Sequence, residues 1–255
     1  MKLIMLGSGT FTGVPRIGND WGACDPNEPR NRRTRCSVII EGESGSRILI
    51  DTSPDLRNQL LAIDIDRVDA VFWTHDHADH SHGIDDLRPM RYGRSNPLPG
   101  FAGEETVRRL RNRFGYVFAG KDGYSTIVRL AQLNRFHLVA GCSVRHCEMP
   151  HGSMTSTGMM FECGDKSIGY AVDYQEITDE MLELFAGVEL LVCDCLRRQP
   201  HPTHAHLDMA LEFADAVGAK QVVLTHMDNT MDYATLSAEL PAHVLVGYDG
   251  LELTI

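Results

Sequence analysis

Residues 75–80 concentrate metal-binding side chains in one short segment. The segment reads His-Asp-His-Ala-Asp-His and follows the apolar run 70–73, which has the composition of a buried strand. His75 and His77 are two residues apart, so both rings project to the same side of an extended chain. The Asp-His pair that closes the segment reaches a neighbouring point as the chain turns, and this spacing suits two adjacent metal ions. The alternative is a polar loop facing water, and three His and two Asp in six residues argue against it.

Other candidate ligands stand where apolar runs end. Asp51, Asp173 and His226 each follow three or four apolar, aromatic or β-branched residues, as the metal-binding segment does. Ligands commonly bind beyond strand ends in layered α/β folds, where loops from several strands converge. Each of these residues alone is more often a turn former, a helix cap or a hydrogen-bonded loop histidine. Their repetition at strand ends favours a shared site.

Short apolar runs separated by turn residues predict the strands that must position these side chains. The expected strands are 3–6, 36–40, 48–50, 68–73, 143–147, 159–162, 168–172, 190–193 and 221–224. Helical periodicity predicts helices at 104–114, 179–185 and 207–217, the second capped by Thr178 and the third stopped by Gly218. Strands and helices alternate without a detectable internal repeat.

The composition is that of an ordinary globular protein. Hydrophobic residues make up 43% and charged residues 23%, and no Gly/Ser- or Pro-rich linker divides the 255 residues. We therefore expect one domain, 1–255, with a helical insertion around 97–145. The seven cysteines form an odd set without zinc-finger spacing, which favours buried, reduced thiols over a disulfide framework.

Targeting signals and net charge restrict the partners of the chain. The N-terminal apolar stretch is too short for a signal peptide, and nowhere do about 18 apolar residues run together to span a bilayer. We expect a cytoplasmic protein without a membrane partner. The formal net charge of -11 disfavours large nucleic acids as partners. Small anionic substrates remain possible, because bound divalent cations can dominate the local potential. The oligomeric state is open, with a homodimer as one outcome.

With His151 in a Met-Pro-His-Gly turn, the candidate ligands form an ordered set that resembles the metallo-β-lactamase superfamily over nearly the whole chain. The resemblance implies an α/β (α+β) fold, the four-layer αββα sandwich, in which two mixed β-sheets pack face to face with helices outside. It implies a first metal ion on His75, His77 and His151, a second on Asp79, His80 and His226, Asp173 as the bridge, and Asp51 as a supporting residue.

The implied ligands, five imidazoles and two carboxylates, suit zinc best, although manganese and iron accept the same donors. Two ions bridged by Asp173 would lie about 3.5 to 4 Å apart, and a hydroxide between them would be the nucleophile. Asp79 and Asp173 are therefore expected to take part in catalysis.

Several short motifs resemble the phosphodiesterase branch of the superfamily, which contains ribonuclease Z and the cyclic-phosphate phosphodiesterase of the carbon–phosphorus lyase pathway. The motifs are Leu6-Gly7-Ser8-Gly9-Thr10, Gly13-Val14-Pro15, Trp21-Gly22, Cys36-Ser37, His80-Ser81-His82-Gly83 and Leu87-Arg88-Pro89. The cyclic-phosphate enzyme is the closer match. It carries a further structural zinc on clustered cysteines and a histidine; here that cluster is reduced to Cys24, and Asn229 stands three residues beyond His226. We predict no third, structural zinc.

A histidine that opens the penultimate long helix of that family corresponds to His206. By the resemblance, His206 would protonate the leaving oxygen or stabilise the charge that develops on the phosphate. A helix-capping or core histidine is the alternative, and the adjoining His201 and His204 are rival positions for a general acid.

Five residues are candidate substrate contacts. Arg88, Arg91 and Tyr92 follow the metal motif and could donate hydrogen bonds to a phosphate, for which the guanidinium geometry is well suited. Surface salt bridges are the alternative for either arginine. Ser8 and Thr10 lie in a short Gly-rich turn that could shape a backbone pocket.

The leading hypothesis is a dinuclear metal-dependent phosphodiesterase that hydrolyses a small cyclic or nucleotide-like phosphodiester. A thioester or lactone hydrolase of the same superfamily is the first alternative, and a non-catalytic domain that binds metal or ligand is the second. Ribonuclease Z activity is disfavoured because the chain is acidic and lacks a long, basic, Gly-rich arm. Five arginines of the 97–145 segment are interpreted as a solvated helix face: Arg108, Arg109, Arg111, Arg113 and Arg129.

Overall fold

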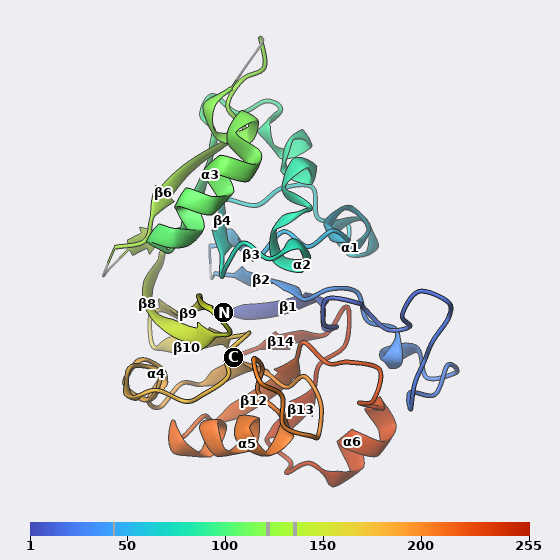
Figure 1. Ribbon diagram of the computed structural model, residues 1–255. Coiled ribbons are helices and arrows are strands. Elements are labelled where there is room, and N and C mark those ends of the chain that lie inside the picture. Colours follow the sequence, from blue (N-terminus) through green and yellow to red (C-terminus); the bar gives the residue numbers. More distant parts are fainter. Residues whose placement is uncertain (43, 121–122, 135–136) are drawn as a thin grey trace.

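The computed structural model describes residues 1–255 except 43, 121–122 and 135–136, and it contains two seven-stranded β-sheets packed face to face (Figure 1). Helices lie on both outer faces of this pair of sheets. The αββα sandwich expected from the sequence is therefore confirmed.

The first sheet is built mainly from the N-terminal half of the chain. Its strands are β1 (Lys2–Gly7), β2 (Ser37–Glu41), β3 (Arg47–Ile50), β4 (Ala70–Trp73), β5 (Leu98–Ala102), β6 (Val128–Gln132) and β14 (Glu252–Thr254). They lie in the order β14-β1-β2-β3-β4-β5-β6, with β3 to β6 parallel. Parallel neighbours need crossover connections, and these contain the helices α1 (Leu56–Ala62), α2 (Ala78–Ser81) and α3 (Glu104–Ala119). Short 3-10 turns are η1 (Pro29–Asn31), η2 (Ile84–Leu87) and η3 (Pro89–Arg91).

The second sheet repeats this plan with the rest of the chain. Its strands are β7 (His137–Val139), β8 (Cys142–His151), β9 (Met154–Cys163), β10 (Lys166–Ala171), β11 (Leu190–Asp194), β12 (Gln221–Thr225) and β13 (Val244–Val246). They lie in the order β13-β12-β11-β10-β9-β8-β7, with β10 to β13 parallel. The crossovers contain α4 (Asp179–Phe185), α5 (Leu207–Ala216) and α6 (Tyr233–Glu239).

Three apolar layers hold the sheets and helices together. Between the sheets, the rings of Phe72 and Phe161 meet edge to face with centroids 5.4 Å apart. On the outer face of the second sheet, Phe185 of α4 and Phe213 of α5 pack in the same way at 5.7 Å. Each fully buried ring contributes about 1.5 to 3 kcal/mol to folding, so these layers fix the sheets relative to each other.

The structure confirms the strands and helices predicted from periodicity and adds elements with weaker signals. Met181 N donates to Thr178 Oγ1 at 3.3 Å, and Gly218 follows α5 with φ 65°, so both predicted helix boundaries are confirmed. The segment 97–145 differs from the expected helical insertion. Apart from residues 121–122 and 135–136, which lie outside the described residues, it holds one helix, α3, and otherwise mainly sheet strands. Its strands β5 and β6 extend the first sheet.

Two of the seven cysteines do not fit the expectation of reduced thiols. Cys142 and Cys163 form a disulfide with Cα atoms 4.5 Å apart, whereas the other five cysteines are free and buried. The reason is the register of the β8–β9 hairpin, which places Ser143 opposite Glu162 and therefore Cys142 opposite Cys163. Separately, every helix in the described part of the chain is too short or too polar to cross a lipid bilayer.

Candidate metal centre

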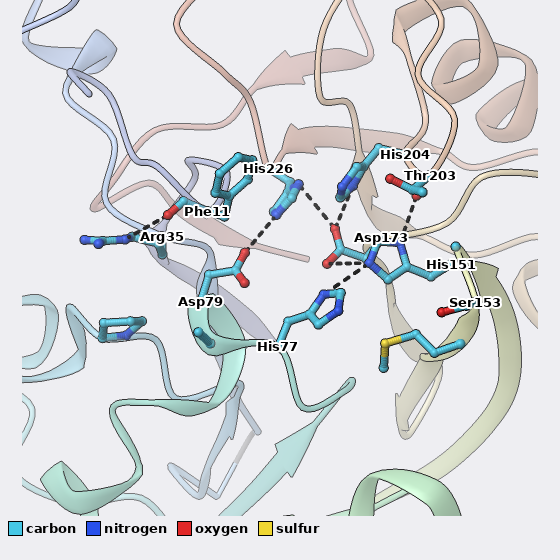
Figure 2. Close-up of a pocket in the computed structure, with 14 residues that line it drawn as sticks. Phe11, Arg35, His77, Asp79, His151, Ser153, Asp173, Thr203, His204 and His226 are labelled. Carbon is cyan, nitrogen blue, oxygen red and sulfur yellow. Dashed lines mark hydrogen bonds and ion pairs between the residues drawn. The ribbon is translucent and has the colours of Figure 1, made fainter. Parts of the chain in front are cut away.

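Loops from both sheets end at one cavity of about 650 Å³ (Figure 2). The first sheet contributes the loop after β4 together with α2, and the second sheet contributes the β8–β9 turn and the loops after β10, β11 and β12. Because the carboxyl ends of parallel strands face this edge, side chains far apart in the sequence converge here.

One cluster joins three histidines to an aspartate. The ligand atoms of His75, His77, His151 and Asp173 all lie within 4.8 Å of one another. Asp173 Oδ2 is 3.2 Å from His75 Nε2, and His77 Nδ1 is 3.3 Å from His151 Nε2. His151 Nδ1 donates to the carbonyl oxygen of Thr203 at 2.8 Å, which leaves Nε2 for the cluster. Burial lowers the pKa of His75 to about 3, so its imidazole is neutral and able to bind a metal at neutral pH.

A second cluster shares the same aspartate. His80 Nε2 lies 3.2 Å from Asp79 Oδ2 and 3.0 Å from Asp173 Oδ2, and His226 Nε2 lies 3.4 Å from Asp79 Oδ2. Burial opposes protonation of His80, but the neighbouring carboxylates, Asp79 first, outweigh it and raise the pKa of His80 above its usual value. A cation binding here therefore competes with a proton, and its affinity rises with pH.

The hydrogen bonding of the two clusters is incomplete without a further group. Among the buried polar atoms that lack a hydrogen-bond partner are His75 Nε2, His80 Nε2 and Asp173 Oδ1. Leaving a buried polar atom unpaired costs about 1 to 3 kcal/mol. The two histidine nitrogens both lie beside Asp173, which lines the cavity. Imidazole nitrogens and carboxylate oxygens are the donors that zinc prefers. The residues therefore fit a divalent metal centre.

Asp51 supports the second cluster from behind. Its Oδ2 lies 2.7 Å from His80 Nδ1, and its Oδ1 accepts a hydrogen bond from Thr74 N at 2.8 Å. Burial raises the pKa of Asp51, although His80 and Thr74 oppose this shift. A carboxylate behind a ligating histidine fixes the orientation of the ring, so the supporting position predicted for Asp51 agrees with its geometry.

Three of these strand-end residues adopt the left-handed backbone conformation. The φ angles of Asp51, Asp173 and His226 are 62°, 64° and 61°. A side chain at such a φ is unfavourable unless surrounding contacts enforce it, and such residues gather at functional sites. Asp and His are among the side chains that adopt this conformation most often.

Helix α3 supports the loop between the first two histidines. Asp76, which separates His75 and His77, is buried, and its Oδ2 lies 2.9 Å from Arg113 Nη2. Arg109 Nη1 is 3.6 Å from Asp76 Oδ1. These two partly exposed arginines therefore pair with a buried carboxylate next to the metal ligands, a contact that our interpretation of them as a solvated helix face did not include.

The structure brings His204, and not His206, into the cavity. His204 Nδ1 lies 3.0 Å from Asp173 Oδ1 and 3.5 Å from Asp194 Oδ2. Burial opposes protonation, but the nearby carboxylates of Asp173 and Asp194 outweigh it and raise the pKa of His204 to about 9. His206 is the N-cap residue of α5 and does not line the cavity.

Asp194 is a site residue that the sequence analysis missed. It is fully buried at the end of β11, and its Oδ1 lies 3.4 Å from His226 Nδ1. The signal that identified Asp51 and Asp173 was present here too, since Asp194 directly follows the apolar run 190–193.

The predicted substrate contacts lie away from the cavity. Arg88 pairs with Asp85 at 3.0 Å, Arg91 Nε donates to the carbonyl oxygen of Thr126 at 3.3 Å, and Tyr92 is exposed outside the cavity lining. The turn that follows the metal motif carries these side chains past the site. Figure 2 instead shows Phe11 and Arg35 among the lining residues.

The Gly-rich turn after β1 is also structural. Ser8 is buried, and its N and Oγ both donate to Asp249 Oδ1 at 2.9 Å. Thr10 is buried as well, and its N donates to the carbonyl oxygen of Met227 at 3.1 Å. These contacts hold the turn against Met227 in the loop after β12 and against Asp249, and they engage the Ser8 hydroxyl. Neither Ser8 nor Thr10 lines the cavity.

Arg33 is buried beside Cys24, the cysteine at which we predicted no structural zinc. Arg33 Nη1 contacts Cys24 Sγ at 3.8 Å, and Arg33 Nη2 donates to the carbonyl oxygen of Met231 at 2.7 Å. A fixed positive charge opposes cation binding at the same point. The absence of a third zinc stays a prediction, and this contact supports it.

Comparison with known proteins gives consistent matches. The model of the family described as "Beta-lactamase superfamily domain" matches residues 46–227. A crystal structure of a new diphosphatase from the PhnP family is 35% identical, covers 99% of this chain and 96% of that chain, and superposes with a TM-score of 0.89. Zinc-bound PqqB from Methylobacterium extorquens is 22% identical, with 100% of both chains covered and a TM-score of 0.79, and shares the fold.

Curated relatives carry other names. The octanoyltransferase of Porphyromonas gingivalis is 35% identical over the whole of this chain, which spans only 52% of that protein. Coenzyme PQQ synthesis protein B of Methylorubrum populi is 26% identical over 76% of this chain and 72% of that protein.

Proposed function

The chain belongs to the metallo-β-lactamase superfamily, in the phosphodiesterase branch with the PhnP-family diphosphatase, and we propose that it is a dinuclear metal-dependent phosphodiesterase. The proposed substrate is a small cyclic or nucleotide-like phosphodiester. The observation that carries this proposal is the pair of clusters that share Asp173 at the floor of one cavity.

The proposed ligand sets follow from these clusters. One ion would be held by His75, His77, His151 and Asp173, and the other by Asp79, His80, His226 and Asp173. Two divalent cations held there, zinc first and manganese second, would lower the pKa of a water molecule and stabilise negative charge on phosphate. Asp51 and Asp194 would hold His80 and His226 in the orientation that ligation needs.

We assign proton donation to His204 in place of His206. Its Nδ1 faces the carboxylates of Asp173 and Asp194, so Nε2 is left to donate toward the cavity. A carboxylate that pairs with one ring nitrogen keeps the imidazole protonated and aligned, which a general acid for an alcohol leaving group requires.

The test is metal content and hydrolysis of bis(p-nitrophenyl) phosphate on one purified sample, with Asp173→Ala as the control. We expect two metal ions per chain, release of p-nitrophenol, and loss of both in the variant. Two ions without release from any phosphodiester would contradict the proposed reaction.

The octanoyltransferase relative favours a second candidate, hydrolysis of an acyl thioester or a lactone. The name describes a protein twice the length of the matched part, so it supports acyl chemistry for this chain only as a proposal. The same centre could attack a carbonyl carbon. Octanoyl thioesters and lactones assayed beside the phosphodiester would distinguish the two candidates, since the leading proposal expects a much larger kcat/KM for phosphodiesters.

A further inference from the structure

Phe11 is an exposed aromatic ring at the edge of the metal cavity. It lines the cavity and remains 62% exposed, although a ring of this size is usually buried. In Figure 2 its ring is drawn on the side of the cavity that carries His226 and Asp79. His204 and Ser153 occupy the other side in the same view.

The backbone around Phe11 is held in place. Thr10 N donates to the carbonyl oxygen of Met227, the residue next to His226, at 3.1 Å. Arg35 Nε donates to the carbonyl oxygen of Phe11 at 3.3 Å, and Arg35 Nη1 contacts both carboxylate oxygens of Asp55 at 2.9 Å. The ring is therefore presented to solvent from an anchored backbone, and a ligand that packs on it does not have to order the loop first.

We infer that Phe11 forms a subsite for a planar ring, and that the preferred ligands carry a nucleobase or aryl group on the phosphate ester. This inference rests on the proposed function, which places the phosphate over the histidines and aspartates of the two metal-binding clusters. An exposed aromatic face stacks with any base, because every base has a π-face. A cavity of about 650 Å³ lies within the usual range for small-molecule sites and accommodates a mononucleotide.

Pure hydrophobic contact is the main competing explanation. An acyl chain would also cover Phe11, but it would gain the same stabilisation from a branched aliphatic side chain of similar area. A planar ring gains more from Phe, Tyr or Trp than from Leu, because stacking depends on the face of the partner. Substitution by Leu therefore separates the two kinds of ligand.

The experiment measures equilibrium binding of AMP and of ribose 5-phosphate to the zinc-loaded protein by titration calorimetry. The variants are Phe11→Ala, Phe11→Leu and Phe11→Trp. The matched control is Leu61→Ala, which removes an apolar side chain that is 65% exposed on α1 and does not line the cavity.

We expect Phe11→Ala and Phe11→Leu to weaken AMP binding by about 5- to 150-fold, the range that one base–aromatic stack supplies. Ribose 5-phosphate should change by less than about twofold, and Phe11→Trp and Leu61→Ala should behave like the wild type. The inference is overturned if the wild type binds AMP no more tightly than ribose 5-phosphate, or if Phe11→Leu binds AMP normally. AMP binding that depends on Phe11, in a protein that cleaves no phosphodiester, would support the subsite and contradict the proposed function.

Discussion

The two halves of the sandwich build the metal centre in different ways. The first half supplies four candidate ligands from the single segment 75–80, whereas the second half supplies His151, Asp173 and His226 from three separate loops. In the first half a local sequence pattern determines the geometry. In the second half the sheet does so, because each loop contributes one side chain and only the strand order brings them together.

The halves nevertheless share a support for their strand-end aspartates. Ser37 Oγ donates to the carbonyl oxygen of Asp51 at 2.9 Å, and Ser156 Oγ donates to that of Asp173 at 2.7 Å. Both aspartates follow the first parallel strand of their sheet, β3 and β10. One of them supports a ligand and the other is placed to be a ligand, so the same local structure serves two purposes.

Removing one ligand from each half should give the largest effects. We expect His75→Ala and His226→Ala each to lose one metal ion and about 10³-fold in turnover of bis(p-nitrophenyl) phosphate, the equivalent of the several kcal/mol that metal-ion stabilisation supplies. Elemental analysis and steady-state kinetics measure both. If either variant keeps two ions and full turnover, the ligand sets are wrong; Asp165→Asn on the exposed β9–β10 turn is the control.

His204 tests whether the second half also supplies the general acid. His204→Ala should lower kcat by about 10²-fold with metal content unchanged, since general acid catalysis contributes about 10²- to 10⁴-fold. His206→Ala, two residues away at the helix cap, should stay near the wild-type value. If His206→Ala lowers kcat and His204→Ala does not, His206 is the general acid.

The supporting carboxylates should matter to similar degrees in the two halves. Asp51→Asn and Asp194→Asn should each weaken metal affinity by about 10- to 100-fold, because each carboxylate orients a ligating histidine. Competition with a fluorescent chelator measures this affinity. A large effect of one variant and none of the other would show that the support is not shared.

The arginine support should have a smaller effect, and among the described residues we find it in the first half alone. Arg113→Met should weaken metal affinity by about 5-fold, because the Arg113 side chain is 44% exposed and solvent screens its pair with Asp76. Arg108→Met is the matched control, since Arg108 lies on the same helix and, within the part of the chain that the structure describes, pairs with Glu105 alone. Equal metal affinities for the two variants would show that α3 does not stabilise the metal-binding loop.

The disulfide should leave activity unchanged. Cys142→Ser with Cys163→Ser should lower the free energy of unfolding by about 3 kcal/mol, the value for a closed loop of this size, because the bond spans 21 residues. Neither cysteine lines the metal cavity. Denaturant unfolding under oxidising conditions measures the loss, and a fall in turnover would show coupling between the hairpin and the site.

The two halves of the sandwich also differ in how much of the metal centre can be predicted from the sequence. The segment 75–80 is readable because its ligands are contiguous, and Asp51, Asp173 and His226 are readable because they end strands. Asp194 carried the same signal but was missed, because no spacing joins it to a ligand. His204 cannot be separated from His206 by sequence alone, since their placement depends on the path of one loop.

Other features depend on pairings that no local pattern reveals. The disulfide requires the register of the β8–β9 hairpin, and the role of Arg113 requires the position of α3 over the metal loop. Phe11 reaches the cavity because its loop is bonded to the residue after His226, more than 200 positions away in the sequence. Long-range contacts of this kind are determined by the fold.

The left-handed conformation of Asp51, Asp173 and His226 has a consequence for mutational tolerance. Glycine adopts this conformation freely, whereas a side chain there costs about 1 to 3 kcal/mol. Glycine at Asp173 or His226 would relieve that cost and also remove a carboxylate or imidazole from the centre. A library scored for cellular abundance and the same library scored for catalysis should therefore rank glycine oppositely at these positions, so the sites most damaging to activity would look benign to a stability screen.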